Sequence, residues 1–405
     1  MRRLFCRTAG QQSDPVIIFR IILTAIFLSH SIALYAADGL LDIGRAVSID
    51  VMLENAIRRG LISGGVVAVG NHTGQLYGTA QGRLYPDAGA PLLTDRTLFD
   101  TASLTKVIAT APAIMKLLEQ GKINLLDPLT RWFPEFEDSD RDEITILNLL
   151  THTTGMNDVE IAAGDPLKSL IEKSIAQNSG TLPGKRFRYA DINFILLGEL
   201  VKRAAHVPLD RFCTENLYAP LGMAETSFLP HAEYNVIAPT AGYNKTLTAG
   251  VVQDSNSRRF GGVAGHAGLF SNASDLNRYA TMILNRGKHN GVRVFTERVI
   301  TQMTSPYFYS NGKVIRGLGW DINSPFSSPR GSYFSDMSFG HTGYSGSSIW
   351  IDPEQDLYVI LLTVRLDYTN VRQFNQLRSD ISSLAVSIFS TPRIAAEIAN
   401  GTKIP

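Results

Sequence analysis

Strand-like and helix-like patterns occupy different parts of the chain. Short runs rich in glycine, valine and other apolar residues occur near both ends, at residues 64–70 and 75–80 and again at residues 347–352 and 357–364. Polar, turn-forming residues separate the two members of each pair. The pattern therefore predicts two pairs of strands, one close to each end of the chain.

Helical spacing of apolar residues dominates the interior. A first helix is expected to begin at Ser48 as its N-cap, and a last one to span residues 372–389. Pro112 should kink the helix that contains it. The predicted interior helices cover residues 107–119, 144–150, 165–177, 192–205 and 273–284.

Both chain ends are thus expected to contribute strands to one sheet, which gives an α/β (α+β) fold with a helical insertion. We predict an α/β lobe from residues 37–119 and 306–392, a mainly helical lobe from residues 120–305, and a C-terminal tail at residues 393–405. The crevice between two such lobes is the expected place for a binding site.

Composition narrows the class of protein. The 405 residues include 38 Lys and Arg against 37 Asp and Glu, for a formal net charge of +1. So nearly neutral a chain lacks the basic footprint of a nucleic-acid-binding protein. Its two cysteines, Cys6 and Cys213, are too few for a disulfide framework or a cysteine zinc site, and Cys213 is expected to be a buried thiol.

Residues 1–36 have the features of a targeting segment. Basic residues open it, an apolar stretch covers residues 21–28, and small residues close it near residue 37. A cleaved secretory signal fits best, and an uncleaved membrane anchor over residues 16–36 is the alternative. Either interpretation predicts export to the bacterial cell envelope, in the periplasm or at the outer face of the inner membrane.

The strongest local motif is Ser103-Leu-Thr-Lys106. A three-residue spacing at the start of a helix places both side chains on one face. A serine hydroxyl needs a nearby base to become a nucleophile, and a desolvated lysine can supply one. Taken alone, the motif is also consistent with a serine cap beside an exposed lysine.

Two further motifs have both structural and chemical interpretations. Tyr189 precedes a predicted helix and could relay a proton, or it could pack while Asp191 caps that helix. The segment Gly-His-Thr-Gly-Tyr-Ser-Gly at residues 340–346 could hold a substrate along a strand, or form a glycine-rich edge with a surface histidine.

Taken together and in this order, the three motifs resemble those of the penicillin-recognising serine hydrolases. The chain is most similar to the branch containing class C β-lactamases and small penicillin-binding proteins, and within it to membrane-associated D-alanyl-D-alanine carboxypeptidases. Segments at residues 150–155, 261–271 and 316–320 are also typical of that branch. The resemblance implies a β-lactamase/transpeptidase-like fold, with an antiparallel sheet flanked by terminal helices.

The resemblance also implies roles for individual residues. Ser103 would attack a carbonyl, Lys106 would be its base, and Tyr189 would carry the proton to the leaving group. The backbone N–H groups of Ser103 and Tyr344 would form an oxyanion hole. On the substrate-binding side would lie Asp191, His341, Thr342 and Gly343. No metal and no cofactor is expected.

Two residues depart from the pattern of many relatives. Asp191 stands where an asparagine is common; a carboxylate close to Lys106 would favour its ammonium form, so Tyr189 is expected to carry more of the proton transfer. His341 replaces a lysine, so binding of a substrate carboxylate is expected to weaken above pH ~6.5. His152 and His266 are expected to stabilise loops.

Three activities fit these motifs: removal of the terminal D-alanine of cell-wall stem peptides, hydrolysis of carboxylic esters, and hydrolysis of β-lactams. The first is favoured, so the expected partner is a peptide or small-molecule substrate. A binding or sensor module on the same fold is a further alternative, which the complete set of Ser103, Lys106 and Tyr189 argues against. Motifs for metalloproteases, phosphate-binding loops and dinucleotide-binding folds do not occur in the sequence.

Overall fold

The computed structural model describes residues 44–390, apart from residues 178–179, 232, 234–235, 242–245 and 311–312. From Ser48 onward the described residues belong to one compact unit. The predicted targeting segment and C-terminal tail lie outside the described residues. Within the described part of the chain, no helix is both long and apolar enough to cross a membrane.

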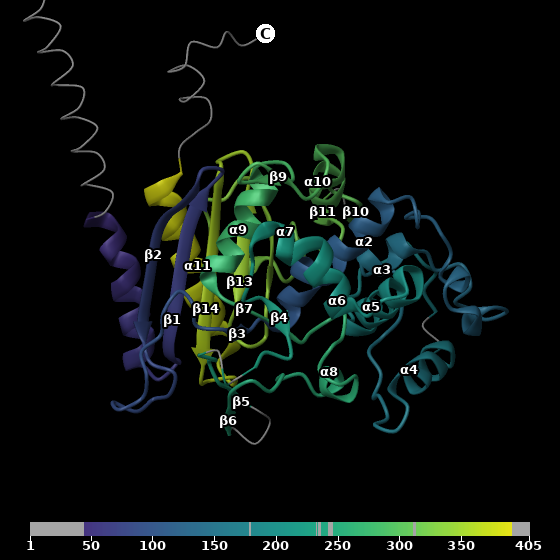
Figure 1. Cartoon of the computed structure of the whole chain (residues 1–405), viewed down its shortest axis with the longest axis horizontal. Coiled ribbons are helices and arrows are strands. Elements are labelled where there is room, and N and C mark those ends of the chain that lie inside the picture. The colour runs from purple at the N-terminus through teal and green to yellow at the C-terminus, as the bar shows by residue number, and fades with distance from the viewer. Residues whose placement is uncertain are drawn as a thin grey trace, which may run out of the picture. The chain divides into compact units, whose positions relative to one another are not determined.

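A five-stranded antiparallel sheet combines the two ends of the chain (Figure 1). Its strand order is β12-β13-β14-β1-β2. The strands are β1 (Ile62–Asn71), β2 (Gly74–Gly82), β12 (Phe339–Thr342), β13 (Ser348–Asp352) and β14 (Leu357–Arg365). The central pair, β1 and β14, joins segments almost 300 residues apart, as the patterns at the two chain ends predicted.

Alternating residues of the sheet pack against helices on its two faces. Val67 and Val69 of β1 face residues 48–58 of the first described helix and helix α11 (Val371–Phe389). Val66 and Ala68 face the larger core, which contains α2 (Ala111–Glu119) and α9 (Ala273–Leu284). The first helix is already formed at residue 44, so the N-cap predicted at Ser48 is wrong.

The interior is largely helical, as predicted, and its helices lie to the right of the sheet in Figure 1. Their bounds are α3 (Ile146–Leu150), α4 (Pro166–Ile175), α5 (Asp191–Ala205), α6 (Leu209–Cys213), α7 (Ala219–Leu221), α8 (Ser255–Arg259) and α10 (Glu297–Thr304). The described residues also form short helical turns. The 3₁₀ turns are η1 (Ala102–Leu104), η3 (Leu129–Arg131), η4 (Pro134–Phe136) and η6 (Ser328–Arg330), and the π-helical turns are η2 (Lys106–Thr110) and η5 (Thr214–Tyr218). The predicted lobe boundaries stay predictions.

The remaining strands are short. They form one three-stranded sheet, ordered β3-β7-β4, and three hairpins. The sheet contains β3 (Phe99–Asp100), β7 (Leu269–Ser271) and β4 (Ser227–Phe228), and the hairpins pair β5 (Thr240–Ala241) with β6 (Leu247–Thr248), β8 (Lys288–His289) with β9 (Val292–Arg293), and β10 (Phe308–Ser310) with β11 (Lys313–Arg316). The pairing of β3 with β7 brings the chain around residue 100 next to the chain around residue 270.

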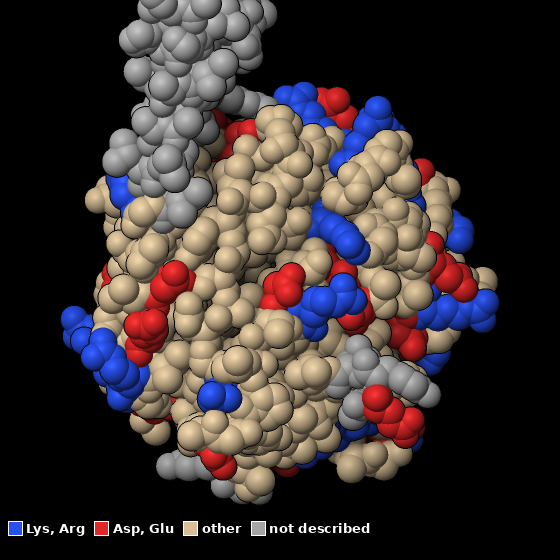
Figure 2. Space-filling view, turned by 60° about the vertical axis from the view of Figure 1, so that its left-hand side comes forward, with Lys and Arg blue, Asp and Glu red and all other residues tan. Residues whose placement is uncertain are grey.

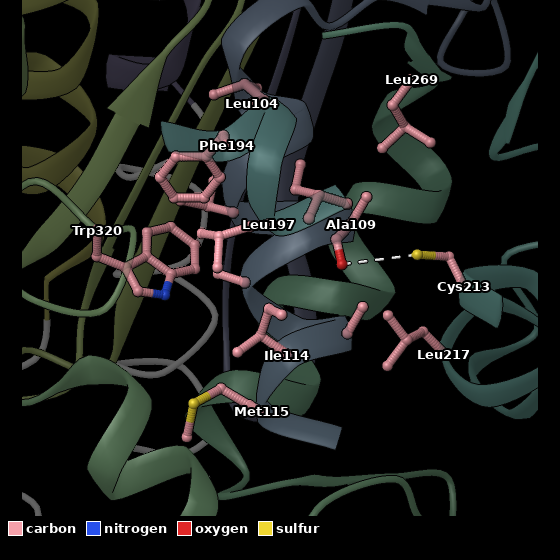
Figure 3. Packing of buried hydrophobic residues seen from close by; sticks show 14 of the residues in the cluster. Leu104, Ala109, Ile114, Met115, Phe194, Leu197, Cys213, Leu217, Leu269 and Trp320 are labelled. Atoms are coloured by element: carbon pink, nitrogen blue, oxygen red, sulfur yellow. Dashed lines mark hydrogen bonds between the residues drawn. The ribbon is translucent and has the colours of Figure 1, made fainter. Parts of the chain in front are cut away.

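The large core holds the segment after Ser103 in place. Figure 3 shows Leu104, Ala109 and Ile114 packed among Phe194 and Leu197 of α5, with Trp320 closing one side. The Cys213 thiol is buried as predicted and donates a hydrogen bond to the Ala109 carbonyl. Because these large side chains are closely packed around it, the segment after Ser103 has little room to move.

Charged side chains are interspersed among uncharged ones on the face shown in Figure 2. Neither sign gathers into a broad patch there. This view agrees with the near-neutral composition of the chain.

Candidate active site

Ser103 and Lys106 lie together at the junction of two short turns. Ser103 is in the 3₁₀ turn η1, and Lys106 opens the π-helical turn η2. The Lys106 ammonium donates a hydrogen bond to the Ser103 hydroxyl across 3.1 Å. The two side chains thus lie together as predicted. Their backbone, however, forms a 3₁₀ turn and a π-helical turn, and α2 begins only after these turns. Pro112 lies in the first turn of α2, directly after the π-helical turn.

The backbone before Ser103 is held in an unusual conformation. Ala102 has a φ of 47°, in the left-handed region that favours glycine. The buried Asp100 carboxylate accepts hydrogen bonds from the Ala102 amide and the Gln253 amide, and so fixes this turn. Burial raises the pKa of Asp100 to about 6. The role of Asp100 was not predicted, although the residue lies just before the Ser103 motif.

Lys106 is fully buried and uses all three of its N–H groups. Besides Ser103, it donates to Asp191 Oδ1 at 2.6 Å and to the His266 carbonyl at 3.1 Å. Burial lowers the pKa of Lys106, but the Asp191 carboxylate raises it, and the net pKa lies above the ordinary value. Lys106 is therefore an ammonium in this structure, as expected for a carboxylate at position 191.

Asp191 contacts Lys106 instead of capping α5. Ala190 is the N-cap residue of α5 and makes no side-chain capping bond. The Ile192 amide at the start of this helix donates to Asp158 Oδ1 at 3.1 Å. Because Asp158 accepts from the helix N-terminus, the Asp191 carboxylate is free to pair with Lys106.

Tyr189 lies beside this pair. Its ring centroid is 5.1 Å from the Lys106 ammonium and 4.5 Å from the centroid of the His152 ring. Burial raises the pKa of the Tyr189 phenol, an effect that the Lys106 charge opposes. The buried His152 accepts hydrogen bonds at Nδ1 from the Ala190 amide and from Asn193, so it stabilises this loop as predicted.

The loop between β12 and β13, residues 343–347, packs directly against the segment that leads to Ser103. Ser345 donates to the Asp100 carbonyl at 2.6 Å, and Ser347 donates to the Thr101 carbonyl at 2.8 Å. A Cβ at Gly343 would lie 2.3 Å from the Thr101 carbonyl oxygen, so this approach requires glycine. The loop carries Tyr344, whose side chain is exposed and whose amide has no hydrogen-bond partner among the described residues. The structure thus places the two predicted oxyanion-hole residues in neighbouring turns.

His341 is buried and faces protein. Its Nδ1 donates to the Thr342 carbonyl across 2.9 Å, and its ring lies 6.0 Å from that of Tyr189. Burial, together with the Arg316 and Lys106 charges, holds the pKa of His341 well below its usual value. With its pKa so low, the imidazole is already neutral below pH ~6.5, so we no longer expect carboxylate binding to weaken as the pH rises past that value. Thr342 ends β12 and is half-buried.

A cavity of about 710 Å³ opens beside Ser103. Its walls include Ser103, Tyr189, Asp191 and Tyr344, but neither His341 nor Thr342. The sequence did not predict the other walls, which come from residues 253–254, 266–267 and 366–369. The charged side chains among the lining residues that the structure describes are acidic: Asp191, Asp254 and Asp367.

One wall is a glycine-rich strap, which we define as residues 264–268. A Cβ at Gly265 would lie 2.0 Å from the Phe194 carbonyl oxygen of α5, so the strap touches this helix backbone to backbone. His266 reaches the cavity and binds Asp254 Oδ1 through Nε2 at 2.7 Å. This bond lowers the pKa of Asp254 against the opposing effect of burial. His266 therefore fixes the loop, as predicted, while its carbonyl accepts from Lys106. A polar residue such as Asp254 directly before a short helix is a sequence signal that could have identified this anchor.

Asp191, Asp254 and His266 also offer three ligand atoms within 4.8 Å of one another. This arrangement is a poor cation site, because Asp191 already pairs with the Lys106 ammonium and His266 with Asp254. A metal ion would have to bind next to a buried positive charge. The donor set is thus better described as the Lys106–Asp191 ion pair beside a hydrogen bond between His266 and Asp254.

Comparison with known proteins gives consistent matches. A model of the beta-lactamase family matches residues 53–378. A Salmonella agona protein named "Putative D-alanyl-D-alanine carboxypeptidase" is 30% identical over 309 residues, covering 67% of this chain and 70% of that protein. A solved class C beta-lactamase superposes with a TM-score of 0.71 at 18% identity, covering 86% of this chain and 97% of its own. The structure of EstCE1, described as a hydrolase with promiscuous acyltransferase activity, gives a TM-score of 0.68 at 21% identity, covering 85% and 99%.

Proposed function

Because the chain belongs to the beta-lactamase family, we propose that it is a serine acyl hydrolase that works through an acyl-enzyme on Ser103. The observation that carries this proposal is the contact between the buried Lys106 ammonium and the Ser103 hydroxyl at the wall of a large cavity. The family and the β-lactamase/transpeptidase-like fold were both predicted from the sequence, and both are confirmed.

In the proposed reaction, the Ser103 oxygen attacks a substrate carbonyl and the carbonyl oxygen becomes an oxyanion. The backbone N–H groups of Ser103 and Tyr344 stabilise that charge, an effect worth about 3 kcal/mol for each donor. Tyr189 donates a proton to the leaving group, since its phenol keeps its proton at neutral pH. Water then hydrolyses the acyl-enzyme.

The favoured substrate is a cell-wall peptide that ends in D-alanyl-D-alanine. The name of the Salmonella agona relative supports this carboxypeptidase activity, and export to the cell envelope, expected from residues 1–36, is part of the same proposal.

A carboxylesterase is the second candidate. The cavity walls in the described part of the chain carry Asp191, Asp254 and Asp367 but no lysine or arginine. A wall of this charge attracts an anionic substrate less than a cationic wall would, and it admits a neutral ester without loss. β-Lactam hydrolysis is the third candidate, and it needs rapid deacylation in addition to acylation.

Intact mass spectrometry after incubation with benzylpenicillin tests the nucleophile. We expect an adduct of the drug's mass on the wild type, no adduct on Ser103→Ala, and a normal adduct on Ser332→Ala, which removes an exposed hydroxyl elsewhere. Release of D-alanine from a peptide ending in D-alanyl-D-alanine would support the carboxypeptidase, and turnover of p-nitrophenyl esters alone would support the esterase. An adduct that survives in Ser103→Ala would refute the proposed nucleophile.

A further inference from the structure

The Lys106 ammonium in this structure has no free electron pair with which to accept a proton from Ser103. Its three N–H groups point at Ser103 Oγ, Asp191 Oδ1 and the His266 carbonyl oxygen. A lysine that serves as a base must first give one of these protons away. The structure therefore raises the question of where the proton goes.

Of the three acceptors around Lys106, Asp191 is the basic one. A carbonyl oxygen such as that of His266 accepts a hydrogen bond but does not take up the proton at ordinary pH, and the Ser103 hydroxyl is the group to be deprotonated. The 2.6 Å contact between Lys106 Nζ and Asp191 Oδ1 is also the shortest of the three. We propose that Asp191 is the terminal proton acceptor of a relay that runs from Ser103 through Lys106.

The relay balances in charge and atoms. As Ser103 Oγ bonds to the substrate carbonyl carbon, its proton moves to Lys106 Nζ while another Nζ proton moves to Asp191 Oδ1. Lys106 remains an ammonium, Asp191 becomes a carboxylic acid, and the negative charge passes to the carbonyl oxygen. When the leaving group departs with the Tyr189 proton, Asp191 returns its proton through Lys106 to the Tyr189 oxygen.

Other charged groups near Asp191 are engaged elsewhere. Asp158 accepts from the Ile192 amide, and burial together with the Asp191 charge raises the pKa of Asp158. Asp254 is held by His266 and by the Ser257 amide. Among the described residues, Asp191 is thus the carboxylate that contacts Lys106.

The relay rests on the proposed acyl hydrolase and assigns a different role to Asp191 from the substrate contact expected at first. Its side chain is 31% exposed and lines the cavity, so it can exchange its proton with solvent between turnovers. The amide that many relatives were expected to have at this position could not accept a proton.

The pH dependence of acylation separates this relay from its rivals. We call the fall of the acylation rate toward low pH its acid limb. If neutral Lys106 were the base, Asp191→Asn would remove the charge that raises the pKa of Lys106, and the acid limb would move to lower pH. If Tyr189 alone took the proton, that limb would not move. If Asp191 is the acceptor, Asp191→Asn can react only after Lys106 loses its proton to solvent, so the limb moves to higher pH.

The experiment is a stopped-flow burst with p-nitrophenyl butyrate, an uncharged ester that does not titrate itself. We expect Asp191→Asn to acylate about 100-fold more slowly at neutral pH, with its acid limb shifted upward. Asp191→Glu should recover much of the rate and the original limb. Asp142→Asn, which removes an exposed carboxylate outside the cavity wall, should match the wild type.

Each outcome has a distinct meaning. A wild type that shows a burst, with an acid limb that is unchanged or lower in Asp191→Asn, overturns the relay and leaves the proposed hydrolase intact. A wild type without a burst and without any adduct on Ser103 overturns the hydrolase and the relay together. If Asp191→Asn does not fold, a limb in Asp191→Glu that departs from that of the wild type overturns the relay.

Discussion

Two buried imidazoles lie near the Tyr189 ring: the ring centroid of His152 is 4.5 Å away and that of His341 is 6.0 Å away. The pKa of each is held well below its usual value, first by burial and then by the positive charges of Arg316 and Lys106. Both side chains are therefore neutral at and above pH ~6.5. In this setting they pack near Tyr189, hydrogen-bond to nearby backbone groups and add no charge to the site.

We predict that binding of an anionic substrate does not titrate with His341. A lowered pKa means that the charged form disappears below the usual range, so no charge is left to lose as the pH rises from about 6 to about 8. The apparent dissociation constant of benzylpenicillin, taken from the saturation of acylation rates, should change by less than about twofold over that interval. A rise of tenfold, absent in His341→Asn, would contradict this prediction.

At the residue scale, the sequence predicts contacts between near neighbours well. The spacing of Ser103 and Lys106 predicts their contact, because three residues span about one turn. The state of His341 could not be predicted, since it depends on burial and on Arg316, which is close to it only in the folded chain. The same holds for Asp191, whose contact with Lys106 and whose neighbour Asp158, which accepts from the start of α5, come from distant parts of the sequence.

At the scale of elements, the glycine-rich strap determines where the His266 carbonyl lies relative to Lys106. Gly265 lies against Gly198 and the Phe194 carbonyl of α5, and its own carbonyl accepts from Thr110 at 2.6 Å. The strap is thus held between α5 and η2. The position of the strap therefore determines whether Lys106 can keep its hydrogen bond to the His266 carbonyl.

We predict that Gly265→Ala displaces the strap. The added methyl would lie 2.0 Å from the Phe194 carbonyl oxygen, so strap or helix must move, at a cost of about 1–3 kcal/mol. Thermal denaturation should show a lower midpoint, and the burst with p-nitrophenyl butyrate should be slower. Gly164→Ala is the matched control, because a methyl group added at Gly164 would meet no other atom within 4 Å. Equal behaviour of the two variants would show that the strap does not position Lys106.

Helix and strand bounds could be predicted to within a few residues where the apolar period is regular. The predicted helix 273–284 coincides with α9, and the predicted strand 357–364 is one residue shorter than β14. The 3₁₀ and π turns at Ser103 and Lys106 could not be predicted, because their shape comes from the Asp100 hydrogen bonds and from the packing around Leu104 and Ala109. Local deviations from regular helix depend on contacts made only in the folded molecule.

At the scale of the whole molecule, segments that lie far apart in the sequence meet at the site. The loop of residues 343–347 hydrogen-bonds to the segment before Ser103, and Arg378 of α11 hydrogen-bonds to that loop. The order of the motifs along the chain predicted that these segments meet. It did not predict the walls at residues 253–254 and 366–369, because loops of this kind carry no periodic signal.

Arg378 is the residue through which α11 holds the loop. It is buried, and its guanidinium donates to the Gly343 carbonyl at 2.5 Å and to the Ser347 carbonyl at 2.9 Å. These two carbonyls lie on either side of Tyr344, whose amide is the proposed second donor of the oxyanion hole. Both bonds come from the same nitrogen, Nη2, whose two N–H groups are fixed in the guanidinium plane, whereas a lysine ammonium lacks that fixed geometry.

We therefore predict that Arg378→Lys weakens catalysis from a distance. Each carbonyl keeps one backbone donor, but the loss of two buried hydrogen bonds from the guanidinium should cost about 2–4 kcal/mol of unfolding free energy, measured by urea denaturation. Because the loop would hold the Tyr344 amide less firmly, the acylation rate should fall by about tenfold or more, with little change in substrate affinity. Arg372→Lys, an exposed change on the same helix, should alter neither quantity. A destabilised Arg378→Lys that acylates at the wild-type rate would show that α11 stabilises the fold without positioning the oxyanion hole.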